Sequence, residues 1–333
     1  MKLLQKIAPA AALCGMSLSA FASAGAPEAG SLLLFPCFDS NRGSLTLLTV
    51  TNTNADVTPV GQQLLAGTVD VEFVYINKHD CQEFNRTRRL TPNDTLTVTA
   101  ALDNPNQREG YAYVFAKSPV TGAAISWNWL IGISQVDSAA GTAVDVNPYV
   151  FQAVGAEGAA TDVNSDGLRN LDGVEYEAAP DRLLVPRFLG QSSQMTQEAG
   201  PAASSTLVLI NLTSAARFTA VVDFLIYNDN EEVFSAQYDF QCWKKVDLDR
   251  INGAFTQSFL MTTGHNPLES VNGVETGWFR INGNLAYSSA DTESNPAILA
   301  ALFERYVGST GELPFTSGTQ TNGELVSQSI FHP

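Results

Sequence analysis

The chain has 333 residues, a length that corresponds to about two domains. A hydrophobic content of 44% against a charged content of 16% excludes a disordered chain, because enough apolar surface is present for sizeable cores. The formal net charge of -16 at pH 7 disfavours nucleic acid and anionic membranes as partners, and it is typical of a soluble extracellular protein.

Residues 1–24 are predicted to be a secretory signal peptide. Lys2 and Lys6 provide a basic start, an apolar run covers residues 7–21, and the small residues up to Ala24 are typical of a cleavage site. The run is too short to span a membrane, and no later stretch is long and apolar enough to do so. We therefore expect cleavage after Ala24, a secreted or periplasmic location, and no integral membrane segment in the mature chain.

Six segments recur in the same order in the two halves of the chain, with offsets that drift as loop insertions would cause. Such repetition predicts an internal duplication, with domain 1 at 25–155, a linker at 156–181, domain 2 at 182–310 and a C-terminal tail at 311–333. The matched pairs are SLLLFPCF with RLLVPRFL, TLLTVTNTN with TLVLINLTS, VDVEFVYIN with AVVDFLIYN, EFNRTRRLTP with DFQCWKKVDL, DNPNQREGYAYVFA with HNPLESVNGVETGWFRI, and GAAISWNWLIG with NPAILAALFERYVG.

Within each copy, the pattern is that of β-strands. Residues 69–77 alternate between an apolar face and a more polar one, and clusters of Asn, Gly, Pro and Asp separate the short segments. Residues 77–80 and 228–230 are predicted hairpin turns. We expect an all-β protein of two tandem β-sandwich domains, immunoglobulin-like in type. One helix is predicted at 295–308, where Asn295 is a candidate cap, although the matching segment in the first copy has the pattern of a strand.

Three cysteines remain after cleavage of the signal peptide, namely Cys37, Cys81 and Cys242. An oxidising compartment permits one disulfide with one free thiol. Cys37 lies in an apolar run and is interpreted as a small buried hydrophobe. The pair Cys81 and Cys242 is slightly favoured, but the sequence alone leaves the pairing open.

The linker contains the sequence DVNSDGLRNLDGVEYE, which begins like a calcium loop. Oxygen-bearing side chains at alternate positions converge on one ion, a glycine turns the chain, and a late acid closes the shell. Position twelve of the usual spacing is Gly173, so the closing acid is left open. A solvated interdomain turn is the alternative. The predicted structural Ca²⁺ ligands are Asp162, Asn164, Asp166, the carbonyl of Leu168, Asn170, and Asp172 or Glu175.

Two tryptophans suggest a ligand-binding face. Trp127 and Trp129 are two residues apart, so they lie on one face if this segment is a strand. A flat pair of indoles can stack on sugar rings, although core packing is the commoner fate of such residues. The partner is predicted to be an extracellular ligand or protein, with carbohydrate as one candidate.

Catalytic motifs are not found in the sequence. The three histidines, His79, His265 and His332, are not accompanied by a nucleophile elbow, a zinc-protease motif or a phosphate-binding loop. We therefore expect no catalytic residue, and a non-enzymatic binding or structural role at the cell surface or outside the cell. The alternatives are a secreted carbohydrate-active or other hydrolytic enzyme, and a periplasmic module that pairs strands with a client.

Five segments resemble a family of secreted proteins from environmental bacteria to which no activity is assigned. The resemblance covers nearly the whole mature chain, and it implies secretion and a shared architecture of β-rich units around the linker motif. The segments are LTLLTVTNTN, EFNRTRRLTPNDT, GVEYEAAPDRLLVPRFLGQ, FLIYNDNEEVFSAQY and ETGWFRINGNLA.

Overall fold

The computed structural model is almost entirely β-structure, which confirms the all-β class expected from the sequence. The predicted signal peptide at 1–24 lies outside the described residues. Within the part of the chain that is described, no helix has the length and apolar character needed to cross a membrane. The described residues are 28–61, 64–137, 143–192, 202–213, 218–263, 274–306, 309–313, 316–321 and 323–325.

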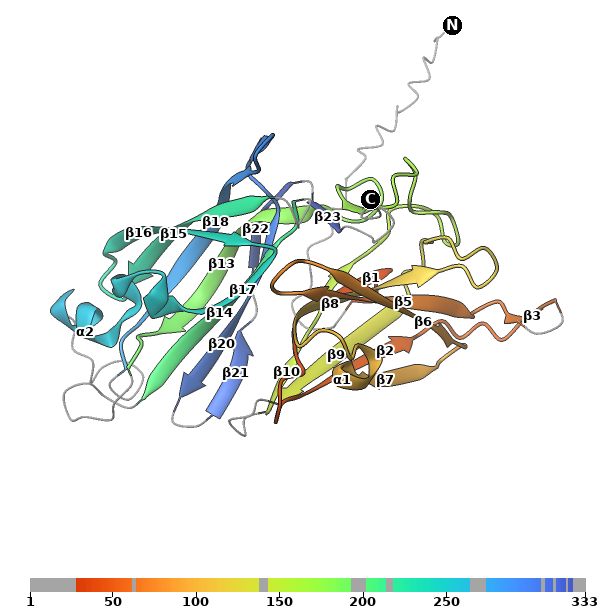
Figure 1. Ribbon diagram of the computed structural model, residues 1–333, viewed down its shortest axis with the longest axis horizontal. Helices are drawn as coiled ribbons and strands as arrows, with labels where there is room; N and C mark the ends of the chain where they lie inside the picture. The colour runs from red at the N-terminus through yellow and green to blue at the C-terminus, as the bar shows by residue number, and fades with distance from the viewer. Residues whose placement is uncertain are drawn as a thin grey trace, which may run out of the picture.

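The N-terminal half of the chain forms two antiparallel sheets (Figure 1). Their strands are β1 (Leu32–Asp39), β2 (Leu45–Asn52), β5 (Val69–Asn77), β6 (Glu83–Leu90), β7 (Thr95–Thr99), β8 (Glu109–Lys117), β9 (Leu130–Asp137), β10 (Ala143–Val146) and β11 (Tyr149–Phe151). The five-stranded sheet has the order β11-β1-β8-β5-β6, and the four-stranded sheet has the order β10-β9-β2-β7.

The C-terminal half repeats this strand order. Its strands are β13 (Ala179–Leu189), β14 (Ala203–Asn211), β15 (Thr219–Asn228), β16 (Val233–Gln241), β17 (Trp243–Asp247), β18 (Thr276–Tyr287), β20 (Ile298–Tyr306), β21 (Ser309–Leu313) and β22 (Thr316–Thr321). The orders are β22-β13-β18-β15-β16, with β19 (Thr292–Ser294) added to β18, and β21-β20-β14-β17. Strand for strand, β13 corresponds to β1, β15 to β5 and β18 to β8.

Short elements complete the fold. The hairpin of β3 (Pro59–Val60) and β4 (Leu64–Leu65) projects from the N-terminal half, and β12 (Arg169–Leu171) pairs with β23 (Gly323–Leu325). The helices are single turns, and they are α1 (Ala100–Asp103), η1 (Leu248–Arg250), η2 (Gly253–Phe255), α2 (Gln257–Leu260) and η3 (Met261–Thr263).

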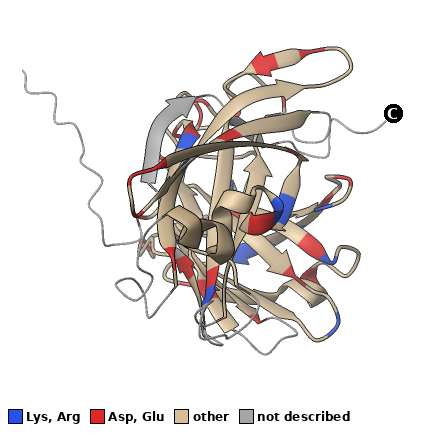
Figure 2. Cartoon of the chain, turned by 90° about the vertical axis from the view of Figure 1, so that its left-hand side faces the viewer, with Lys and Arg blue, Asp and Glu red and all other residues tan. Residues whose placement is uncertain are grey.

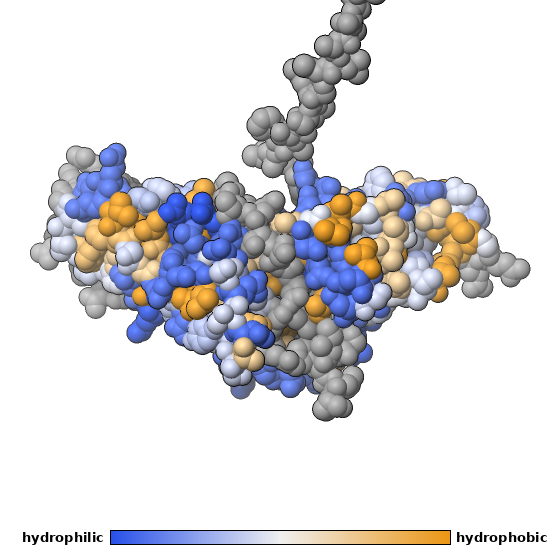
Figure 3. All heavy atoms as spheres, turned by 90° about the horizontal axis from the view of Figure 1, so that it is seen from above, coloured by the Kyte–Doolittle hydropathy of each residue, from blue (hydrophilic) through white to orange (hydrophobic). Residues whose placement is uncertain are grey.

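Each half has its core between its two sheets. In the N-terminal half, Phe35, Phe73 and Val114 of the five-stranded sheet belong to the same buried cluster as Leu48 and Val98 of the four-stranded sheet. The C-terminal half has an equivalent cluster that contains Phe224, Phe279 and Leu209. Hydrophobic and hydrophilic residues are intermingled on the face of both halves seen in Figure 3.

A third cluster lies between the halves. It joins the outer face of the five-stranded sheet, through Leu34 and Tyr113, to the outer face of β14 and β20, through Ile210 and Leu299. The indole N–H of Trp243 donates to the carbonyl oxygen of Pro36 across this boundary, at 2.8 Å. The four sheets therefore follow one another as layers, with the five-stranded sheet and the four-stranded sheet of the C-terminal half in the middle.

Several predictions about the elements need correction. Residues 295–308 were expected as a helix, but they contain strand β20, whose residues from Ile298 to Leu302 are all buried. Such a strand is covered on both faces and therefore lacks the alternation that distinguishes it from a buried helix. The pairing of EFNRTRRLTP with DFQCWKKVDL is also wrong in register, because the counterpart of β6 is β16. The two predicted hairpin turns, by contrast, are confirmed.

The expected tail after residue 310 is not a tail where it is described. It contributes β21 and β22 to the sheets of the C-terminal half, and β23 pairs with β12. These segments are rich in Gly, Ser and Thr, so no apolar alternation marked them as strands. The immunoglobulin-like order is also not observed, because that order places the first two strands side by side, whereas β1 and β2 lie in opposite sheets.

Candidate functional site

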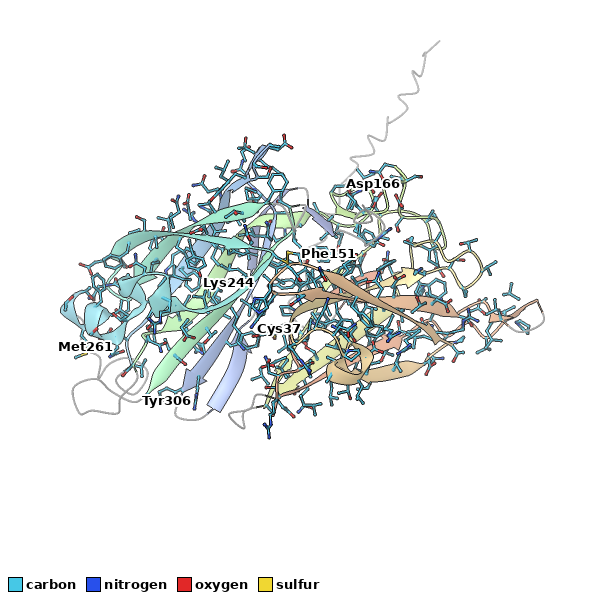
Figure 4. All side chains as sticks on the ribbon, in the orientation of Figure 1. Cys37, Phe151, Asp166, Lys244, Met261 and Tyr306 are labelled. Carbon is cyan, nitrogen blue, oxygen red and sulfur yellow. A yellow bond between two sulfur atoms is a disulfide. The ribbon has the colours of Figure 1, made fainter. Side chains whose placement is uncertain are left out.

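The linker loop lies against the N-terminal half rather than extending freely between the halves. Ala160 bridges to Ile125, and Tyr176 bridges to Ala153, on either side of the loop. Tyr176 and Leu171 are fully buried in the cluster between the halves. Asp166 is labelled in Figure 4 at the tip of this loop. The segment predicted as a linker is therefore held at both of its ends.

The first predicted ligands face one another. The carboxylate of Asp162 accepts hydrogen bonds from the backbone N–H groups of Asp166 and Gly167, both at 3.1 Å. Asn164 accepts from the Asp166 N–H at 3.1 Å and donates its amide to the Asp166 carboxylate at 2.7 Å. Gly167 has a φ of 80°, in the left-handed region, which lets the chain turn sharply as position six of a calcium loop requires.

Asp166 is the centre of this arrangement. Its carboxylate accepts from the Leu168 N–H at 2.8 Å and from the Asn170 amide at 3.4 Å. Burial alone would raise the pKa of Asp166, but the hydrogen bonds from Leu168, Asn164 and Asn170 outweigh it and hold the pKa below its ordinary value. The residue is therefore an anion at neutral pH, as a cation ligand must be.

The two candidates for the closing acid have different positions. Glu175 is only 1% exposed, and its two carboxylate oxygens accept from the backbone N–H groups of Val163, at 3.0 Å, and Asn170, at 3.1 Å. Asp172 accepts from the N–H groups of Val174 and Glu175 instead. Glu175 thus spans the start and the end of the loop, whereas Asp172 only shapes the turn that follows it.

The donor set fits a hard cation in kind. Asp162 and Asp166 supply carboxylates, and Asn164 and Asn170 supply amide oxygens, which are the ligands that Ca²⁺ takes in proteins. The acidic side chains alone are less concentrated: among the described residues, no group of three or more His, Cys, Asp or Glu side chains is arranged to hold a metal. Calcium binding therefore stays a prediction.

A pocket of about 550 Å³ adjoins the loop. It lies between the outer face of the five-stranded sheet and residues 160–169. Arg169 forms part of its wall; the guanidinium lies 5.0 Å from the centre of the Phe115 ring, and its Nη2 donates to the Gly167 carbonyl at 3.0 Å. No sequence motif predicts this pocket, because its residues come from four strands (β5, β6, β8 and β12) and from two loops that are far apart in the chain.

The two tryptophans do not form a common ligand face. Both precede β9 in a turn, so the alternation of a strand does not apply to them. Trp127 is 5% exposed and donates its indole N–H to the side chain of Asn52 at 3.2 Å, whereas Trp129 is 39% exposed. Trp127 is therefore packed in the core, and the two indoles do not form a stacking platform.

The cysteines connect the halves. Cys81, after the β5 strand, is joined by a disulfide to Cys242, between β16 and β17, with their Cα atoms 5.9 Å apart. Cys37 is a buried free thiol, and burial raises its pKa to about 12, so it is a hydrophobic side chain rather than a nucleophile. Figure 4 labels Cys37 at the boundary between the halves.

His79 is exposed in the β5–β6 hairpin, and His265 and His332 lie outside the described residues. Acidic and basic side chains are interspersed along the strands of the C-terminal half in Figure 2. Arg88 pairs with Asp103, and Arg89 pairs with Asp70, within the N-terminal half.

Comparisons with known proteins yield little. No family model matches the chain, and no curated protein matches it significantly. Among solved structures, the chain is similar to the N-terminal CBM22-1–CBM22-2 tandem domain of Xyn10C from Paenibacillus barcinonensis, with 11% sequence identity over 83% of this chain and 78% of that chain. The TM-score is 0.18.

Proposed function

We propose that this protein is a secreted, non-enzymatic binding or structural protein that acts at the cell surface or outside the cell. In this proposal, a structural Ca²⁺ is held by the loop between two duplicated β-sandwich domains. The observation that carries the proposal is the geometry of the loop, in which Asp162, Asn164, Asp166 and Asn170 point toward one another and Glu175 ties the two ends together.

The duplication is supported by the strand order, which is the same in the two halves. The two halves also share an irregularity in strand pairing. The register of β1 with β8 shifts between Phe35 and Phe38, and the register of β13 with β18 shifts at the equivalent point, between Val185 and Phe188. Two facing sheets with a buried cluster between them are the arrangement of a β-sandwich. The secreted location is supported by the Cys81–Cys242 disulfide, since such bonds persist in oxidising compartments.

In this proposal the ion would be held by Asp162, Asn164, Asp166, the Leu168 carbonyl, Asn170 and Glu175. The bound cation would offset the repulsion between the three carboxylates. The role is structural, because the loop leads directly into β12, which pairs with β23, and into the buried Tyr176. A fixed loop would therefore fix the segment that joins the halves.

The experiment is calcium titration of the metal-free protein by calorimetry, together with thermal melting in excess Ca²⁺ and in chelator. We expect Ca²⁺ to bind and to raise the melting temperature. Glu175→Gln should weaken Ca²⁺ binding at least ten-fold, whereas the matched variant Asp172→Asn should weaken it much less. Absence of binding heat together with an unchanged melting temperature would contradict the calcium site. A larger loss of Ca²⁺ affinity in Asp172→Asn than in Glu175→Gln would contradict Glu175 as the closing ligand.

The non-catalytic part of the proposal is tested separately. The protein is incubated with panels of polysaccharides and peptides, and the products are followed by mass spectrometry. We expect no turnover. Turnover that is abolished by changing a single acidic residue would establish the enzymatic alternative and overturn a purely binding role.

A further inference from the structure

The pocket beside the loop has the character of a ligand site. Its volume of about 550 Å³ lies within the range of small-molecule pockets in proteins, which is roughly 300–1,000 Å³. Polar or charged residues and apolar residues or glycine contribute equally to its lining. The lining includes Glu72, Asn85, Phe115, Lys117, Ala124 and Arg169.

The polar side chains of the pocket have hydrogen-bonding capacity that the protein does not use. Arg169 is 6% exposed, and its Nε and Nη1 atoms are buried without a hydrogen-bond partner, as is the side-chain oxygen of Asn85. Buried polar groups are normally paired, and leaving them unpaired costs free energy. A ligand that reaches these atoms would supply the hydrogen-bond partners that the protein does not provide.

The charges of the pocket are balanced. Lys117 forms an ion pair with Glu72, and Arg169 lies 3.9 Å from the carboxylate of Asp162. An ionic ligand would leave a charge without a counterion in this partly enclosed site. A hydroxyl group adds no charge, and it can accept a hydrogen bond from Arg169 and donate one to Asn85.

Apolar walls complete the complementarity. Phe115 and Ala124 are largely buried but retain a small exposed surface in the pocket, so they offer contact to the C–H surface of a ring that carries hydroxyl groups at its edge. The corresponding face of the C-terminal half lacks this apolar wall. The strand registers show that Asn282 on β18 occupies the position that Phe115 has on β8. The site is therefore particular to the N-terminal half and its loop.

We propose that this pocket binds a neutral, hydroxyl-rich ligand of the size of one or two sugar rings. The proposal rests on the binding function proposed above and names the ligand class and the site. Asn85 and Arg169 recognise hydroxyl groups, and Phe115 and Ala124 contact the ring. Asp162 and Ser165 belong to both the loop and the pocket wall, so a bound Ca²⁺ would also steady one side of the site.

The test is saturation-transfer NMR and calorimetry with glucose, galactose, xylose and cellobiose, and with glucuronate and L-glutamate as charged probes. At least one neutral sugar should bind, and each charged probe should bind at least ten-fold more weakly. Binding of no neutral sugar, or stronger binding of a charged probe, would overturn the proposal.

Two variants locate the site. Ala123 is exposed and lines the pocket, so Ala123→Trp should fill it and abolish sugar binding, and Asn85→Ala should weaken binding three- to ten-fold. The same substitution at an exposed turn of the other half, Ala290→Trp, should leave binding unchanged. Circular dichroism and melting establish that each variant is folded. Full sugar binding by a folded Ala123→Trp variant would place the sugar elsewhere and overturn the pocket.

The two proposals fail in different ways. Sugar binding that persists in chelator, without calcium binding, would refute the calcium site and leave the pocket standing. Calcium binding without sugar binding would refute the sugar pocket and leave the calcium site standing. NMR spectra of the sugars after prolonged incubation show whether the sugars are chemically altered. Alteration would refute the non-enzymatic role and leave the pocket as the site of recognition.

Discussion

Trp243 of the C-terminal half reaches across the boundary and donates its indole N–H to the carbonyl oxygen of Pro36, 2.8 Å away in β1 of the N-terminal half. The ring is 4% exposed and belongs to the cluster that joins the two halves. Pro36 lies in the irregular part of β1, between Phe35 and Phe38, where the pairing with β8 is interrupted. The irregularity thus leaves a carbonyl free for a partner outside the sheet.

Replacing Trp243 with Phe should destabilise the protein through this bond. The variant keeps an aromatic ring in the cluster but leaves the buried Pro36 carbonyl unpaired, which costs about 1–3 kcal/mol of unfolding free energy. Urea denaturation followed by circular dichroism measures the change. The control is Trp129→Phe, at a more exposed ring with no side-chain role in the boundary, where a change of about 0.5 kcal/mol or less is expected. Equal effects of the two variants would contradict this account.

The disulfide should contribute strongly to the stability of the whole molecule. Cys81 and Cys242 are separated by 161 residues, so the bond restricts a long loop of the unfolded chain. The double variant Cys81→Ser/Cys242→Ser should lose about 2–5 kcal/mol of unfolding free energy. Cys37→Ala, which keeps the disulfide, serves as the control for cysteine loss in the same cluster, and it should still resist denaturation better than the double variant. An unchanged midpoint for the double variant in denaturant would refute the prediction.

Glu83 should make stability depend on pH. Burial is the main cause that raises the pKa of its carboxyl from the ordinary 4.5 to about 8; Glu72 raises it further, while Tyr113 and Arg169 oppose the shift. The folded state therefore keeps a proton that the unfolded state has released. The contribution of this group to stability should be full below about pH 4.5, fall as the pH rises from there to about 8, and then become constant.

The Glu83→Gln variant should flatten this dependence, because a neutral amide does not titrate. Glu312, whose pKa is raised by burial to about 7, contributes a further slope that the variant retains. Denaturation at a series of pH values measures both effects. The exposed Glu157, changed to Gln in the same way, should leave the profile as it was. A wild-type stability that rises steadily from pH 5 to pH 8 would contradict the sign of the prediction.

Strands could be predicted from the sequence where buried and exposed residues alternate. In β15, every second residue from Ala220 to Asn228 is buried, and that period of two is visible in the residue types. The sequence was insufficient at β20, since both faces of this strand are covered and its apolar run carries no period. The residue pattern also failed to predict the strands after residue 310, because these segments are rich in Gly, Ser and Thr and show no apolar alternation.

The candidate site shows the same division. The spacing of Asp162, Asn164 and Asp166 is local, so the loop could be recognised from a short stretch of residues. The different positions of Asp172 and Glu175 could not be predicted, because they depend on the path of the backbone, which brings the Glu175 carboxylate to the Val163 N–H. The pocket could not be predicted without the three-dimensional structure, because Asn85, Phe115 and Arg169 come together only when the strands and the linker are assembled.

The layered packing has a further consequence for assembly. The five-stranded sheet accepts the C-terminal half on its outer face, and the C-terminal half presents an equivalent outer face of its own. A series built on this plan could continue without end, as in head-to-tail polymers. The residues at the equivalent positions differ in polarity: where β8 has Tyr113 and Phe115, β18 has Arg280 and Asn282. The outer sheet of the C-terminal half therefore presents polar side chains to water where the equivalent face of the N-terminal half packs against another sheet.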